Sequence, residues 1–250
     1  MRPSVCTIYA FARTADDFAD EGVRTQEERL QLLDEWRSQL DECYSGRASH
    51  PVFVALAETI VQAGIPRELL ADLLTAFRVD VTQNRFSTFS DLLFYCKHSA
   101  NPVGRLVLHV FNNATERTMA LSDHICTALQ LTNFWQDVSG DWLKGRIYIP
   151  LEDMRRFGYT ESEIGRKVLD SRFRRMLRYE IDRTKAMFSN GKPLLQEATE
   201  RLRPELRLTW GGGLKILRKI ESSGYDVLTG PPRITLGDKL AILTKAILFR

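Results

Sequence analysis

The chain has 250 residues, of which 44% are hydrophobic and 27% charged, and its formal net charge is +3. This composition is ordinary for a globular protein and provides enough chain for one large core. The charge is too weak to indicate nucleic-acid binding, but it suits an anionic small substrate or an anionic membrane surface. No stretch approaches the roughly 18 apolar residues of a membrane span. The four cysteines lack zinc-ligand spacing and are interpreted as reduced thiols of a cytoplasmic protein.

Apolar residues recur with helical spacing from the start of the chain. The pattern predicts early helices over residues 4–21, 26–43, 51–63 and 66–79. An irregular polar stretch follows over residues 78–87. Thr88 and Asp91 then form a capping-box pattern that begins a helix through about Phe111. Asn101-Pro102 predicts a break within that helix.

The second half of the chain is also predicted to be helical. Thr115 caps a long helix that ends near Leu143, and Thr160 with Glu163 forms a second capping box. Further helices are expected over residues 166–189, 192–202, 204–222 and 236–249. The basic run at 166–185 is interpreted as a solvated face. Because sustained strand-like alternation is absent, the sequence predicts an all-α fold with a single domain over residues 1–250.

Residues 128–150 carry a polar stripe within an otherwise apolar helix. The stripe has steps of three, four, four and three residues, so its side chains lie near one helical face; its members are Gln130, Asn133, Asp137, Asp141 and Lys144. Asp137 and Asp141 are expected to be about 5–6 Å apart at Cβ. Burying such groups costs several kcal/mol unless they pair, form hydrogen bonds or bind a cation. The alternative is an exposed acidic face.

A second acidic cluster occupies residues 13–21. Asp16 and Asp20 are four residues apart, and Asp17 lies four residues after Arg13, with which it could pair. A solvated face is the plain alternative, but the flanking aromatic residues and alanines indicate a buried helix. If the two acidic faces meet across a cavity, their like charges require cations.

The oxygen-rich set of candidate ligands favours Mg²⁺, with Mn²⁺ as an alternative. None of the four histidines has the Glu-x-x-His spacing of di-iron bundles. Because Mg²⁺ usually binds one or two carboxylates together with substrate phosphates, the acidic helices suggest a diphosphate substrate. Arg13, Lys144 and Arg146 would add positive charge. Aromatic faces such as Tyr95 and Tyr148 could stabilise the carbocation left when diphosphate departs.

Four segments resemble the squalene/phytoene synthase family. YAFARTADDFAD and LQLTNFWQDVSGDWLKGRIYIP resemble its two aspartate-rich motifs, LLFYCKHSANPVGRL resembles its central helix, and GYDVL followed by Arg233 resembles its C-terminal signature. The resemblance implies an isoprenoid-synthase-type helical bundle around a central cavity. It implies that Mg²⁺–diphosphate is bound by Asp16, Asp17, Asp20, Asp137 and Asp141. It further implies a site lined by Arg13, Tyr95, Gln130, Asn133, Arg146, Tyr148, Tyr225 and Arg233, with Tyr148 counted among the catalytic residues.

Gln136 distinguishes the chain from family members that condense two prenyl diphosphates, which typically have arginine at this position. With ADDFADEG and NPVGR, it makes the chain similar to the bacterial hydroxysqualene synthase branch associated with hopanoid pathways. That branch ionises presqualene diphosphate and quenches the rearranged cation with water, without NADPH. With glutamine in place of arginine, the site has one cationic side chain fewer, which suits a substrate that carries one diphosphate and not two. Gln136 is therefore counted as substrate-binding. Family members usually begin with a further helix, which we expect this chain to lack.

Three alternatives remain open. The first is head-to-head condensation of two farnesyl or geranylgeranyl diphosphates to presqualene diphosphate, squalene or phytoene, against which Gln136 argues. The second is a non-catalytic relative acting as a scaffold, which would not need the five aspartates. The third is a head-to-tail prenyltransferase, which is disfavoured because its motifs are usually DDxxD. We expect a cytoplasmic enzyme with no nucleic-acid partner. Peripheral contact with the inner membrane and coupling to other squalene-pathway enzymes are left open.

Overall fold

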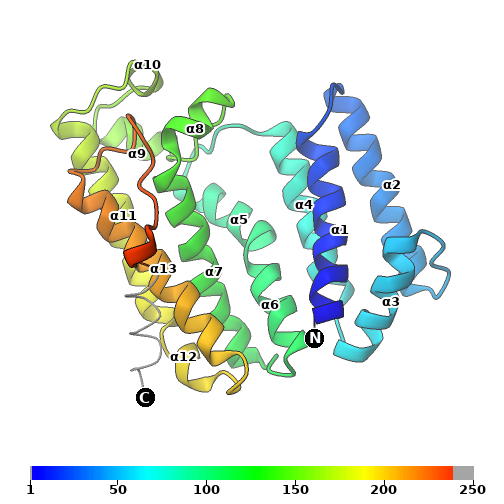
Figure 1. The fold of residues 1–250 in the computed structure, drawn as a ribbon. Coiled ribbons are helices and arrows are strands. Elements are labelled where there is room, and N and C mark those ends of the chain that lie inside the picture. The colour runs from blue at the N-terminus through cyan, green and yellow to red at the C-terminus, as the bar shows by residue number, and fades with distance from the viewer. Residues whose placement is uncertain (1, 239–250) are drawn as a thin grey trace. The chain divides into compact units, whose positions relative to one another are not determined.

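The computed structural model describes residues 2–238 (Figure 1). Over this range the backbone consists of helices and their connections, and β pairing is confined to an isolated parallel bridge between Arg85 and Ile147. The all-α prediction is therefore confirmed. The helix predicted over residues 236–249 lies, beyond residue 238, outside the described residues.

Contacts divide the chain into two compact units, Met1–Gln83 with Tyr95–Met119 and Asn84–Phe94 with Ala120–Arg250. The single domain stays a prediction, and each unit is described by itself. Two helices, α5 (Phe89–Ser99) and α7 (Glu116–Gln136), contribute residues to both units.

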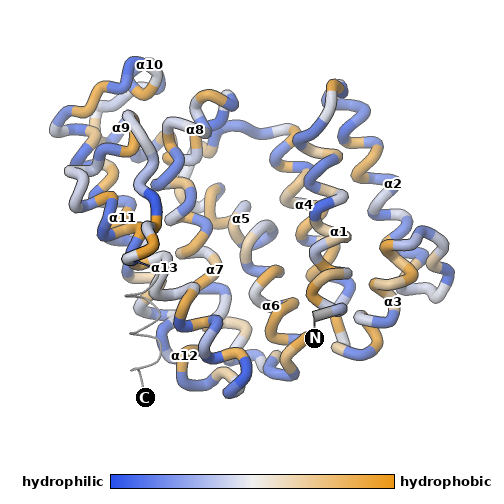
Figure 2. Tube along the Cα trace, viewed as in Figure 1, coloured by the Kyte–Doolittle hydropathy of each residue, from blue (hydrophilic) through white to orange (hydrophobic). Residues whose placement is uncertain are grey.

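The first unit is a group of helices around α1 (Figure 1). Its members are α1 (Arg2–Asp20), α2 (Gln26–Tyr44), α3 (Pro51–Ala63), α4 (Arg67–Thr82) and α6 (Asn101–Val110). Hydrophobic and hydrophilic stretches are interleaved along α1 and α2 (Figure 2), as expected for helices with one buried face. Phe11 of α1 is fully buried and stacks on Trp36 at a ring-centroid distance of 6.1 Å and against Phe53 at 5.8 Å. This aromatic cluster anchors the middle of α1.

The C-terminal end of α1 is held by one arginine of α2. The guanidinium of Arg29 donates to the carbonyls of Ala19 at 2.7 Å, Gly22 at 3.0 Å and Phe18 at 3.1 Å. Phe18 and Ala19 belong to the last turn of α1, whose carbonyls have no partner within the helix itself, and Gly22 lies just after it. Arg29 therefore fixes the turn that carries the first acidic cluster.

The second unit contains the rest of the helices. They are α8 (Val138–Leu143), α9 (Leu151–Arg156), α10 (Glu161–Gly165), α11 (Ser171–Gly191), α12 (Leu194–Glu197) and α13 (Arg203–Ser222). Two glycines allow close approach to α7: a Cβ on Gly191 would lie 2.5 Å from Ile125, and one on Gly213 would lie 2.9 Å from Leu129. The indole of Trp135 also donates to Thr184 Oγ1 at 2.8 Å. These contacts pack α7 tightly against α11 and α13.

Several helix boundaries were predicted correctly. Thr88 and Asp91 form the reciprocal hydrogen bonds of a capping box, and so do Thr160 and Glu163. The predicted break at Asn101-Pro102 is confirmed, because α5 ends at Ser99 and α6 begins at Asn101.

Three boundary predictions were wrong. The helix expected through Leu143 ends at Gln136 because the backbone of Asp137 departs from helical values, with φ −108° and ψ 26°. The helix expected over 192–202 is reduced to α12, since Ala198 is extended. The basic helix begins at Ser171, where Asp170 accepts from the amides of Arg172 and Phe173 as an N-cap.

The basic run 166–185 has the predicted solvated face, with Arg166, Lys167, Arg174, Arg175 and Arg178 exposed, but Arg183 is an exception. Arg183 of α11 is largely buried and pairs with Asp153 of α9 at 2.9 Å and with the fully buried Glu180. Its guanidinium carbon lies 3.3 Å from the ring centroid of Phe89. Burial raises the pKa of Glu180 to about 8, and its ion pair with Arg183 opposes that shift. One arginine thus serves two buried carboxylates, and burial favours the protonated form of Glu180.

Candidate active site

The first acidic motif lies in the last two turns of α1. Arg13 donates to Asp16 Oδ2 at 2.9 Å and contacts Asp17 Oδ1 at 2.7 Å, as the spacing predicted, and Glu21 lies 3.8 Å from the same guanidinium. Arg13, Asp16 and Asp17 are 40–47% exposed at their side chains, and Asp20 is exposed. The flanking aromatic residues were expected to be buried, but Tyr9 is 66% exposed, because the buried face of α1 runs through Phe11, Ala15 and Ala19 instead.

The second acidic motif spans the junction of α7 and α8. Asp137 N donates to Asn133 O at 3.0 Å and Asp141 N donates to Asp137 O at 2.9 Å, so helical hydrogen bonding continues on both sides of the irregular residue. The carboxylate of Asp137 folds against Gly140, where an added Cβ would lie only 2.4 Å from Oδ1. The lack of a side chain at position 140 makes room for this carboxylate.

The carboxyl group of Asp141 is perturbed by its surroundings. Burial and, next, the negative charge of Asp137 raise the pKa of Asp141 to about 7, and Lys144 and Arg146 oppose the shift. Asp141 is thus mainly desolvated, and the like charge of Asp137 adds to that effect. Such a pair favours any further cation that reaches it.

The loop after α8 carries three predicted site residues, Lys144, Arg146 and Tyr148. Lys144 is exposed and Arg146 half-buried, and Arg146 N donates to Asp141 O at 2.8 Å. Tyr148 stacks on Phe134 at a centroid distance of 3.8 Å and an interplanar angle of 7°, and on Phe86 at 5.6 Å. The tyrosine therefore lies within an aromatic stack rather than in an open loop.

Arg85 holds this loop, and the sequence did not identify it. It donates to Gly145 O at 2.6 Å, pairs with Glu161 at 2.9 Å, and lies in a segment whose Asn84 carbonyl accepts from Ile147 N at 3.0 Å. The polar stretch 78–87 signalled only irregular structure. The partner of Arg85 in this loop is a main-chain carbonyl, and a sequence pattern cannot predict such a partner.

The C-terminal signature meets the end of α7. Gln136 Nε2 donates to Pro232 O at 2.7 Å. Arg233 is exposed, and its carbonyl accepts from Lys219 Nζ at 2.9 Å. Tyr225 has a positive φ of 65° directly after Gly224, so it sits in a tight turn that follows α13. Gln136 and Arg233 are therefore brought together, although 96 residues separate the bonded positions.

The other predicted residues lie elsewhere in their units. Tyr95 is buried and its hydroxyl donates to Asp80 Oδ1 at 2.7 Å. On α7, Gln130 is half-buried and Asn133 is exposed. Their roles, like those of the other site residues, stay predictions.

The family model described as Squalene/phytoene synthase matches residues 1–238. The chain belongs to the squalene/phytoene synthase family. It is thus an enzyme of squalene/phytoene synthase type with an isoprenoid synthase fold, and the predicted membership is confirmed.

Relatives from several branches of the family resemble the chain. It is 39% identical to the hydroxysqualene synthase of Zymomonas mobilis, over 66% of this chain and 55% of the relative. It is 31% identical to the hydroxysqualene synthase of Rhodopseudomonas palustris, over 88% and 75%. The phytoene synthase of Arthrospira platensis is 30% identical, over 98% and 83%.

A solved structure also resembles the chain closely. The crystal structure of squalene synthase HpnC from Alicyclobacillus acidocaldarius superposes with a TM-score of 0.86 at 37% identity, and the match covers 92% of this chain and 85% of that one.

The residues of both motifs fit a hard divalent cation. The side-chain atoms that could bind a metal ion are carboxylate oxygens, which Mg²⁺ prefers as ligands. Among residues 2–238, no three histidine, cysteine, aspartate or glutamate side chains are grouped so that they could hold an ion by themselves. Mg²⁺ is typically bound through one or two carboxylates and completed by phosphate oxygens. The motifs therefore fit an ion that is completed by a diphosphate.

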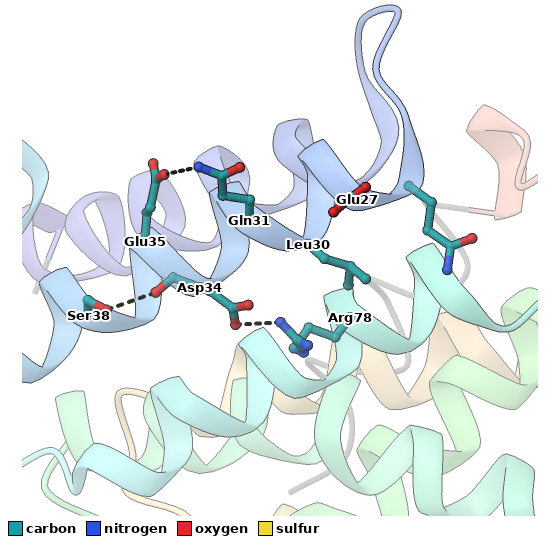
Figure 3. Close-up of a pocket in the computed structure, with 8 residues that line it drawn as sticks. Glu27, Leu30, Gln31, Asp34, Glu35, Ser38 and Arg78 are labelled. Carbon is teal, nitrogen blue, oxygen red and sulfur yellow. Dashed lines mark hydrogen bonds and ion pairs between the residues drawn. The ribbon is translucent and has the colours of Figure 1, made fainter.

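A separate surface pocket lies between α2 and α4 (Figure 3). Its lining includes Glu27, Leu30, Asp34, Glu35 and Arg78, and Arg78 pairs with Asp34 at 2.5 Å. Its acidic side chains lie outside both aspartate motifs, and its single arginine is paired. We assign it no part in the reaction.

No helix within the described residues combines the length and hydropathy needed to cross a membrane.

Proposed function

We propose that the chain is a Mg²⁺-dependent hydroxysqualene synthase. In this reaction the C–O bond of presqualene diphosphate breaks and the diphosphate leaves with the electron pair. The cyclopropylcarbinyl cation rearranges, water adds to it, and the added water loses a proton. NADPH is not required, because no hydride is transferred.

The roles of the residues follow from their chemistry. Bound Mg²⁺ supplies positive charge for the departing diphosphate. Asp16, Asp17, Asp20, Asp137 and Asp141 hold the metal–diphosphate complex, and Arg13, Lys144, Arg146 and Arg233 bind phosphate oxygens. Tyr148 is assigned to stabilising the positive charge of the carbon skeleton. Tyr95, Gln130, Asn133 and Tyr225 complete the substrate site.

The crowded pair of Asp137 and Asp141 is the observation that carries the proposal. The pKa of Asp141 is raised to about 7, chiefly by burial and by Asp137, despite two neighbouring cations. A cation shared with a diphosphate would relieve that crowding. Two hydroxysqualene synthases at 39% and 31% identity support the choice of substrate, and so does the neutral Gln136.

Condensation of two prenyl diphosphates is the second candidate. It is supported by the phytoene synthase of Arthrospira platensis, which matches 98% of this chain at 30% identity. The two candidates differ in substrate, so product analysis separates them.

The test incubates purified protein with Mg²⁺ and either presqualene diphosphate or farnesyl diphosphate, without NADPH. Hydroxysqualene from the first substrate alone is expected. Presqualene diphosphate or a phytoene-like product from a prenyl diphosphate would instead establish the second candidate.

Asp16→Asn and Asp137→Asn should each lose at least about 100-fold in kcat with the fold intact, whereas Asp34→Asn, on the α2–α4 surface, should retain full activity. Near-normal turnover by either motif variant would refute the metal-binding assignment.

We also propose that the protein works in the cytoplasm with peripheral contact to the membrane, where it can be coupled to other enzymes of squalene synthesis. The C30 product partitions into lipid, which favours its synthesis at a membrane surface. Co-sedimentation with anionic vesicles tests the contact.

A further inference from the structure

The segment between α13 and the end of the described chain, residues 226–238, forms a strap, and both of its ends are anchored. At its start, Val227 and Leu228 are buried, and Asp226 accepts from Thr229 N at 3.0 Å. At its end, Asp238 pairs with Lys219 at 2.5 Å and with Lys215 at 3.0 Å. The middle of the strap is thereby presented as a defined loop.

Gln136 bonds to the middle of this strap. Its amide donates to the carbonyl of Pro232 at 2.7 Å, and Lys219 donates to the next carbonyl, that of Arg233, at 2.9 Å. The two bonds fix consecutive peptide groups from α7 and α13. Pro231 and Pro232 restrict the backbone further. The backbone of Arg233 is therefore held more firmly than that of an ordinary exposed loop residue.

Each bonded residue directly precedes a charged one. Gln136 precedes Asp137, and Pro232 precedes Arg233, so the hydrogen bond joins the residue before the second acidic motif to the residue before an exposed arginine. A glutamine provides this connection without adding charge. An arginine at position 136 could make the same bond but would add a cation.

We propose that Gln136 is a positioning residue that sets substrate choice through the Pro232 carbonyl. By this bond it holds Arg233 where it binds the single diphosphate, and its neutrality leaves the local charge matched to one diphosphate rather than two. The inference rests on the proposed function for the identity of the ligand, but the bond itself and its effect on Arg233 can be tested separately.

The first experiment measures binding of inorganic pyrophosphate with Mg²⁺ by calorimetry, so that turnover is not needed. Gln136→Met keeps the length of the side chain and removes the donor. It should weaken binding about 5- to 10-fold, the effect of one lost hydrogen bond. Gln62→Met is the matched control, because Gln62 also donates through its amide, to Glu58 at 2.8 Å, but on the exposed face of α3. It should leave binding unchanged.

A double-mutant cycle separates positioning from a direct role. If Gln136 acts through Arg233, adding Gln136→Met to Arg233→Gln should weaken binding no further than Arg233→Gln alone. Additive losses would overturn the proposal. Amide hydrogen exchange over residues 229–235 should accelerate in Gln136→Met and stay unchanged in Gln62→Met; unchanged exchange in both would also overturn it.

Gln136→Arg tests the charge argument without removing the donor. The strap should keep its protection, while the preference for presqualene diphosphate over farnesyl diphosphate, measured as the ratio of kcat/KM values, should fall at least about tenfold. Loss of strap protection, or an unchanged ratio, would refute the role in substrate choice. If the wild-type protein does not convert presqualene diphosphate at all, the proposed function fails, whereas the pyrophosphate cycle still decides whether Gln136 positions Arg233.

Discussion

Gly140 shows how a single position can shape the site without touching substrate. A Cβ there would lie 2.4 Å from Oδ1 and 2.8 Å from Cγ of Asp137, so the carboxylate occupies the space that any side chain would fill. Because the obstructing atoms are the movable end of an aspartate, an alanine can be accommodated by rotating that carboxylate. The effect should fall on its orientation and not on the fold.

We therefore predict that Gly140→Ala preserves stability, or raises it by up to about 1 kcal/mol through higher helix propensity, and lowers kcat about 100-fold. Thermal unfolding and steady-state kinetics measure the two effects. Gly212→Ala is the matched control in α13, where the nearest atom to an added Cβ is Ile234 Cδ1 at 3.9 Å. Full turnover by Gly140→Ala would mean that the position of the Asp137 carboxylate is unimportant.

At the scale of elements, the end of α1 depends on Arg29 of α2. Its guanidinium donates to carbonyls of the last turn and of the two residues just after it at 2.7–3.2 Å. Loss of a charged, part-buried donor of this kind costs about 1.5–3 kcal/mol, so Arg29→Met should lower Tm by about 3–12 °C. Arg24→Met, which removes an exposed donor to Glu21 O, should have less than half the effect. Equal losses in the two variants would contradict the prediction.

The packing of α9 against α11 should carry a pH signature from Glu180. Burial raises the pKa of this residue to about 8 from 4.5, so folding favours its protonated form. Its contribution to stability is fully present below about pH 4.5 and is lost as the pH rises through about 8. Glu180→Gln, which mimics the protonated form, should therefore gain Tm relative to the wild type steadily between pH 5 and pH 9.

Urea unfolding across this pH range provides a second measurement of the same trend. Glu58→Gln changes an exposed glutamate of α3 and should show no such trend. A constant Tm difference between Glu180→Gln and the wild type would show that Glu180 is ionised throughout.

The sequence predicted elements and acidic pairs well because both have a short-range signature. Periodicity located the helices, and the spacing of Arg13 and Asp17 foretold their ion pair. Sequence-based prediction failed where the local structure depends on main-chain groups or on partners far away in the chain. The bend at Asp137, the capture of the Gly145 carbonyl by Arg85 and the bond from Gln136 to Pro232 all use main-chain groups. Main-chain groups are the same at every position, so a residue pattern cannot predict which of them will be bonded.

At the scale of the whole molecule, the aspartates come from both compact units: Asp16 from the first and Asp137 from the second. If one metal–diphosphate complex engages both motifs, its binding energy stabilises the two units together. A ligand at 100 times its Kd adds about 2.7 kcal/mol, which corresponds to a rise in Tm of about 5–10 °C for a chain of this size. Mg²⁺ with pyrophosphate should produce this rise in the wild type, and neither component should do so alone.

The decisive comparison uses one variant from each unit. Asp16→Asn and Asp137→Asn should each abolish the entire ligand-induced rise in Tm, and combining them should change nothing further, because both remove parts of one binding event. Asp34→Asn should keep the full rise. If the motifs instead bind separate ligands, each single variant would retain part of the shift and only the double variant would lose it all. Differential scanning fluorimetry at saturating Mg²⁺ and pyrophosphate distinguishes these outcomes without any substrate, and therefore independently of which prenyl diphosphate the enzyme uses.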